Sequence, residues 1–187
     1  MTGRFSYDHV TVLLVAFEVA LFATTGVLHL LRPAHLRVAS AGHVAAGAIS
    51  PRAASRVSPR RLAAVELLTT LLVLVAALSR HRAVLLVSQV VLAMLATLFI
   101  AFLLRLQRAP LPLACGCHPL ESVVTRASFL PAIATVAATA TALALAQAAG
   151  AAVPRPHTAG DAIALGEIVL LGWAMAFAVI IRSGASE

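Results

Sequence analysis

The sequence predicts an all-α protein: a polytopic membrane helix bundle of five spans. Of the 187 residues, 61% are hydrophobic and only 11% are charged, a composition typical of chains that lie in a bilayer. Five apolar runs are each long enough to cross ~30 Å of hydrocarbon at ~1.5 Å per residue. The chain also has too few polar residues to cover the outside of a soluble bundle of five helices.

The first two apolar runs cover residues 10–31 and 62–78. The first run is long, contains Glu18 and lacks the basic start and small-residue cleavage site of a secretory signal, so we expect an uncleaved first helix. The second run is the shortest. Arg60 and Arg61 precede it, and their long side chains can reach the headgroups, so we expect it to span the membrane as well.

The remaining runs cover residues 83–104, 128–149 and 162–181. In the fourth run, alanines recur at helical spacing and predict a stripe along which another helix can approach closely. These alanines are Ala134, Ala138, Ala142 and Ala146. No connector is long enough to hold a soluble domain.

The connectors place particular side chains on one membrane face. Successive spans alternate in direction, so the connectors 32–61 and 105–127 share a face whichever way the protein is inserted. His29, at the end of the first span, and Glu66, near the start of the second, belong to that face. Within the first connector, residues 33–50 mix histidine and arginine with small apolar residues, which suits a short interfacial helix; a disordered basic loop is the alternative.

The chain contains fourteen arginines, no lysine and seven acidic residues, which gives a net charge of +7. Most of these arginines flank the apolar runs, where cationic residues set orientation and meet anionic headgroups. Nothing in the sequence resembles a nucleic-acid-binding motif. We therefore expect the arginines to interact with the lipid bilayer and not with nucleic acid.

The only two cysteines, Cys115 and Cys117, are separated by Gly116 and followed by His118. Glycine permits the backbone angles that a disulfide between residues i and i+2 requires, but so small a ring is strained. Exposed, strained disulfides are the exchange-competent ones. His118 and the arginines that bracket the connector favour the thiolate form, so one cysteine can attack a partner disulfide and the other can resolve the mixed disulfide.

Two other interpretations of the cysteine motif stay open. Two thiolates and an imidazole suit a soft ion such as Cu(I), or half of a zinc site completed by a second chain, which would indicate metal binding or transport. The thiols can also be small buried side chains of a purely structural membrane subunit.

Carboxylates inside a membrane span are costly and indicate function by default. We expect Glu66 to orient His29 or the cysteine loop, or to accept a proton during thiol exchange; a role in helix packing is the alternative. For Glu18 and Glu167 we favour packing, and a proton path through these acids is a third class of function.

Four segments together resemble the MauE/DoxX-like redox-associated membrane proteins: "GVLHLLRP" at 26–33, "AVELLTTLLVLVAAL" at 64–78, "ACGCHP" at 114–119 and "TRASFLPA" at 125–132. The resemblance implies a polytopic membrane helix bundle with a four-helix core over residues 1–150, to which this chain adds a connector and a C-terminal transmembrane helix over residues 151–187. It also implies disulfide handling outside the cytoplasm, as in maturation of the small subunit of methylamine dehydrogenase with a thioredoxin-like partner. It implies that Cys115 and Cys117 are the redox pair, that Glu66 is the acid of the second helix, and that Arg126 is the arginine of the fourth. No cofactor motif is present, and a membrane quinone is one candidate electron acceptor.

The arginines and the resemblance disagree about orientation. Ten arginines lie on the cysteine face and four on the other, which by the positive-inside rule predicts a cytoplasmic motif. Arg80 and Arg82, however, lie on the shortest turn, where retention in the cytoplasm is strongest. With the resemblance, this favours a multi-pass protein of the cell membrane with the cysteine motif on the extracytoplasmic face.

Overall fold

The computed structural model describes residues 2–56, 58–79, 82–109, 124–148 and 159–184. Within these ranges the chain is an all-α helix bundle, as predicted. Five of its helices are long and apolar enough to span a membrane: His9–Leu31, Pro59–Ser79, Ala83–Gln107, Arg126–Gln147 and Asp161–Arg182. These spans agree with the five apolar runs to within three residues at each end, so the protein is a multi-pass membrane protein whose environment is a lipid bilayer.

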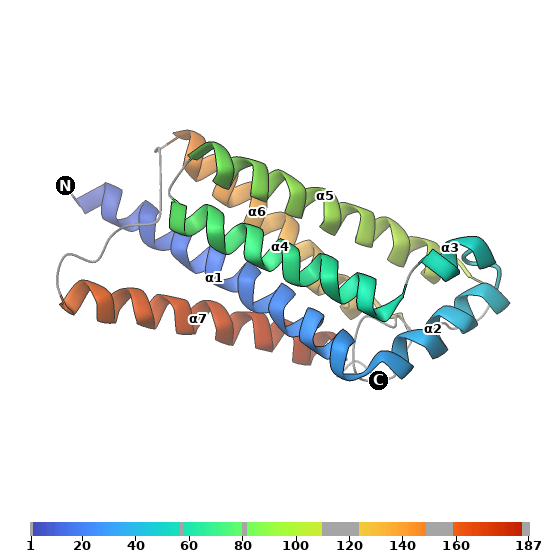
Figure 1. Cartoon of the computed structure of the whole chain (residues 1–187). Coiled ribbons are helices and arrows are strands. Elements are labelled where there is room, and N and C mark those ends of the chain that lie inside the picture. Colours follow the sequence, from blue (N-terminus) through green and yellow to red (C-terminus); the bar gives the residue numbers. More distant parts are fainter. Residues whose placement is uncertain (1, 57, 80–81, 110–123, 149–158, 185–187) are drawn as a thin grey trace.

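The elements follow one another in the order shown in Figure 1. They are α1 (Thr2–Leu31), α2 (Pro33–Ala45), α3 (Pro51–Arg56), α4 (Pro59–Ser79), α5 (Arg82–Gln107), the 3₁₀ turn η1 (Arg126–Phe129), α6 (Leu130–Ala148) and α7 (Ala159–Gly184). The helix expected within the first connector is therefore present as α2, and a second short helix, α3, follows it.

Proline and serine set the starts of the helices in the first connector. Proline is the first residue of α2, α3 and α4, a position where its missing N–H costs nothing and its fixed φ suits the helix. Ser58 precedes α4, and its hydroxyl oxygen accepts the backbone N–H of Arg61 at 3.2 Å, as an N-cap does. Beyond α2 the chain turns at Gly47, whose φ of +69° lies in the left-handed region that favours glycine.

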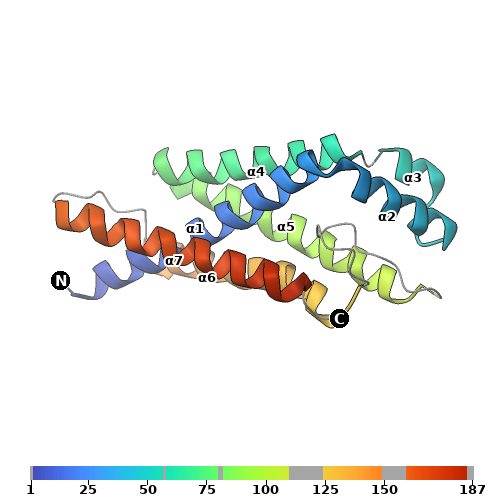
Figure 2. The ribbon, with the colours of Figure 1, turned by 90° about the horizontal axis from the view of Figure 1, so that it is seen from below.

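Helix α1 is the centre of the bundle. It packs along α4 on one side and α7 on another, and it also contacts α6 (Figures 1 and 2). Helix α7 comes unusually close, because a Cβ at Gly172 would lie 2.8 Å from the Cβ of Ala16 and 2.9 Å from the carbonyl oxygen of Leu13. Only a residue without a side chain allows the two backbones this approach.

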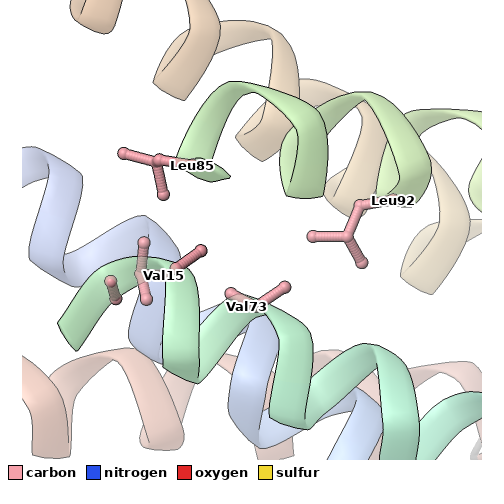
Figure 3. Packing of buried hydrophobic residues seen from close by; sticks show 6 residues of the cluster. Val15, Val73, Leu85 and Leu92 are labelled. Carbon is pink, nitrogen blue, oxygen red and sulfur yellow. The ribbon is translucent and has the colours of Figure 1, made fainter. Parts of the chain in front are cut away.

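Two hydrophobic clusters hold α1 in place. The first joins α1, α4 and α5 through Val15, Val73, Leu85 and Leu92 together with Ala76 and Ala77 (Figure 3). The second joins α1, α6 and α7, and it includes Ala138 of the predicted alanine stripe. Ala142 and Ala146 of that stripe are buried as well, so its expected role in close packing is confirmed.

A third cluster lies at the end of the bundle that carries α2 and α3. Ala48, from the link between those helices, packs with Leu106 at the end of α5; Phe102, Ala109 and Val124 border them. The connector 32–61 and the described ends of the connector 105–127 therefore meet at one end of the bundle, as the counting of spans predicted.

Candidate functional site at the arginine-rich end

A largely buried histidine–glutamate pair joins α1 to α4 near the end of the bundle that carries α2 and α3. His29 lies in the last turn of α1, and Glu66 lies in the second turn of α4. The Nδ1 atom of His29 is 2.7 Å from Oε2 of Glu66. The side chains are only 7% and 15% exposed, so the contact is largely shielded from solvent.

Gly26 allows the two helices to approach closely enough for this pair. It lies three residues before His29, hence on nearly the same face of α1. A Cβ at Gly26 would lie 3.0 Å from Cγ of Leu67 and 3.3 Å from Cβ of Glu66. The glycine therefore faces the backbone that carries Glu66, and its missing side chain is what brings the carboxylate within reach of the imidazole.

The geometry defines what the pair can do chemically. With its hydrogen on Nδ1, His29 donates to the carboxylate of Glu66, and its Nε2 is left as a proton acceptor. A carboxylate that holds an imidazole in one tautomer makes the other ring nitrogen a directed general base. Thr70, on the same face of α4, donates its hydroxyl to the backbone carbonyl of Glu66 at 2.9 Å, which ties it to the helix backbone.

A second buried histidine lies close to the end of α5. His43 of α2 is 3% exposed, and its ring meets that of Phe102 edge-on with centroids 5.6 Å apart. Phe102 borders the third cluster, as Ala109 and Val124 also do. Ala109 and Val124 flank the segment 110–123 in the sequence, and both border this one cluster.

Nine exposed arginines surround this end. They lie on α2, α3, α4, α5, η1 and α7 or, as Arg32 and Arg108 do, directly beside a helix. They are Arg32, Arg37, Arg52, Arg60, Arg61, Arg105, Arg108, Arg126 and Arg182. We call this the arginine-rich end; long cationic side chains near the ends of membrane spans can reach the lipid headgroups.

Of the candidate site residues singled out from the sequence, two are described by the structure and three are not. Glu66 contacts His29, whereas Arg126 is exposed as the first residue of η1, in a turn capped reciprocally by Thr125 and Ser128. Cys115, Cys117 and His118 lie outside the described residues, so their roles stay predictions. Among the described residues, no three His, Cys, Asp or Glu side chains are grouped so that they could hold a metal ion.

Sequence reasoning missed two residues. Gly26 was part of the quoted "GVLHLLRP" segment, and its three-residue spacing from His29 is the signal that could have assigned it to a close helix contact. Gln89 was passed over inside the third apolar run, yet it donates from Nε2 to Oε2 of Glu18 at 2.8 Å. An isolated amide in an apolar span indicates a buried polar partner on another helix.

Comparison with known proteins adds no assignment. The chain matches no protein-family model, no curated protein and no solved structure.

Proposed function

We propose that the protein is a membrane thiol–disulfide redox protein that oxidises an extracytoplasmic client through Cys115 and Cys117. The observation that carries the proposal is the position of the only two cysteines in the sequence: their C-G-C motif lies between Ala109 and Val124, which both pack against the cluster of Ala48 and Leu106 at the arginine-rich end. Cys117 is eight residues from Ala109, so the chain limits their separation to about 28 Å. The sequence therefore connects the motif on both sides to residues of the end that carries His29 and Glu66.

The proposed reaction is a two-electron exchange. A thiolate of the client attacks the Cys115–Cys117 disulfide and forms a mixed disulfide, and the second client thiolate displaces the protein sulfur. The client gains a disulfide, the protein gains two thiols, and two electrons have passed to it. An acceptor must then take two electrons and two protons to restore the protein disulfide, and a membrane quinone, which becomes a hydroquinone, has this stoichiometry.

His29 and Glu66 support this proposal as proton-handling groups. Client thiols must lose protons before they attack, and the reformation of the protein disulfide releases two more. In the Nδ1–H tautomer, Nε2 of His29 is an acceptor for such a proton, and Glu66 stabilises the imidazolium that results. The resemblance to MauE/DoxX-like proteins points to a thioredoxin-like partner or a disulfide-containing client, and to Arg126 as an additional functional residue.

Cysteine labelling in intact cells tests the proposal. A membrane-impermeant maleimide should label the protein only after mild reduction, and Cys115→Ser and Cys117→Ser should each label without reduction. Each variant should insert normally and lose client oxidation. Labelling that requires permeabilised cells would place the motif in the cytoplasm, and oxidation retained by both variants would refute the redox role. Stoichiometric copper or zinc that is lost in the same variants would indicate the metal-binding alternative.

A further inference from the structure

A carboxyl group and an amide face each other inside the bundle. Glu18 of α1 and Gln89 of α5 are each 1% exposed, and Nε2 of Gln89 donates to Oε2 of Glu18 at 2.8 Å. Glu18 lies nine residues after His9 and thirteen before Leu31, or about 14 Å and 20 Å along the helix from the ends of this span. The pair therefore lies deep in the region that spans the bilayer.

Two oxygen atoms of this pair have no donor. They are Oε1 of Glu18 and Oε1 of Gln89, both buried. An ionised carboxylate only accepts hydrogen bonds, so an ionised Glu18 would leave both oxygens unsatisfied in an apolar interior. Such unpaired buried acceptors are strongly disfavoured.

No cation of the described chain compensates for a charge on Glu18. The described parts of α5 from 83 to 104 and of α6 contain no acid or base. On α4, Glu66 pairs with His29, which is eleven residues, about 16 Å, farther along α1. On α7, Glu167 is exposed on the surface of the bundle. A charged Glu18 would therefore have only the amide of Gln89 to stabilise it.

A single proton satisfies both unpaired oxygens. We propose that Glu18 and Gln89 form a proton-binding site in the middle of the bundle, in which the hydroxyl of protonated Glu18 donates from Oε1 to Oε1 of Gln89. With the hydrogen bond from Nε2 of Gln89, this completes a reciprocal acid–amide pair. A proton suits the site better than a metal cation, because the pair supplies two side chains where hard cations take six or more oxygen ligands.

The site couples protonation to helix packing. Glu18 and Gln89 connect α1 to α5, the helices that contribute Val15, and Leu85 and Leu92, to the first hydrophobic cluster (Figure 3). Loss of the proton leaves a carboxylate between these helices, so it must admit water or a cation there. The inference does not depend on the cysteine motif, because Glu18 and Gln89 take no part in the proposed redox reaction. Glu18 is about 16 Å from His29 along α1.

Infrared spectroscopy of the purified protein in lipid at neutral pH tests the proposal. The carbonyl stretch of a protonated carboxylic acid should be present, should shift in D₂O, and should move on ¹³C labelling of glutamate. Glu18→Gln should abolish the band, whereas Glu167→Gln, which changes an exposed acid, should retain it. A wild-type protein without the band, or a Glu18→Gln variant that keeps it, would overturn the proposal.

A stability comparison gives a second readout. Glu18→Gln preserves the shape of the pair and supplies an N–H for Oε1 of Gln89, so its thermal midpoint at neutral pH should match that of the wild type. At alkaline pH the wild type should lose thermal stability and Glu18→Gln should not. A Glu18→Gln protein as unstable as Glu18→Ala would show that the carboxylate form is required. A wild-type protein that is more stable in sodium than in choline, with no such difference in Glu18→Gln, would identify a metal cation as the ligand. Each of these two results would contradict the proposal.

Discussion

Replacement of Gly172 by alanine should weaken the contact between α1 and α7. The new Cβ would lie 2.8 Å from Cβ of Ala16, 2.9 Å from the carbonyl oxygen of Leu13 and 3.0 Å from the backbone nitrogen of Phe17. Ordinary carbon–carbon contacts are about 3.5–4.0 Å, so α7 must move away by about 1 Å. Two of the three atoms belong to the backbone, which means that no side-chain rotation can relieve the overlap.

The matched control is Gly166→Ala on the same helix, where a Cβ would meet no atom of the described chain within 4 Å. Both variants gain the same helix propensity, about 1 kcal/mol for alanine over glycine, so this gain cancels in the comparison. Overpacking of a rigid contact costs about 1–3 kcal/mol. Gly172→Ala should therefore unfold with a free energy about 1–3 kcal/mol lower than that of Gly166→Ala.

Equilibrium unfolding in mixed micelles of increasing denaturing detergent measures this difference. Trp173 is the only tryptophan of the chain and belongs to α7, so its fluorescence reports changes in the surroundings of this helix as the bundle unfolds. Each variant is compared with its own folded and unfolded baselines, because residue 172 adjoins the fluorophore. Equal stability of the two alanine variants would refute the close packing of α7 on α1.

Three further predictions concern the arginine-rich end. Replacing either member of the buried pair, by His29→Leu or Glu66→Leu, should destabilise the protein, and a double-mutant cycle of unfolding free energies should give a coupling of about 1–2 kcal/mol; additive effects would mean that the pair contributes nothing. Gly26→Leu should separate α1 from α4 and lower the rate of thiol oxidation about as much as Glu66→Leu does, and an unchanged rate in a folded variant would contradict the positioning role of the glycine. Ser58→Ala should lower the free energy of unfolding by about 1 kcal/mol, because it removes the N-cap of α4. The control is Ser55→Ala, which removes a hydroxyl that is hydrogen-bonded within α3 and caps no helix start.

Local sequence signals account for most of the fold. The five spans are visible because a helix must satisfy its own backbone groups in a bilayer, so each one needs a long apolar run. Their alternation then places His29 and Glu66 at one end without any knowledge of packing. The expected helix after the first span is present as α2, which Pro33 begins; the turn at Gly47 follows it.

The pairing of helices was less visible. The central place of α1 depends on contacts such as that of Gly172 with Ala16, and a glycine in a span has the same local appearance whether it faces lipid or a helix. Gly166 and Gly172 illustrate this, since only the second touches α1. Side-chain hydrogen bonds between distant helices, such as Glu18 with Gln89, likewise depend on rotation of each helix about its axis.

The sequence by itself determined that the protein is an all-α membrane bundle, which segments span the bilayer, and which connectors share a face. It also singled out the C-G-C motif and Glu66 as candidates for chemistry. Only the tertiary structure decided that Glu66 reaches His29 beside Gly26, and that Glu18 meets Gln89 in the core. The physical reason is that hydrophobicity and chain alternation are properties of single segments, whereas pairing needs close packing between surfaces that are far apart in the chain.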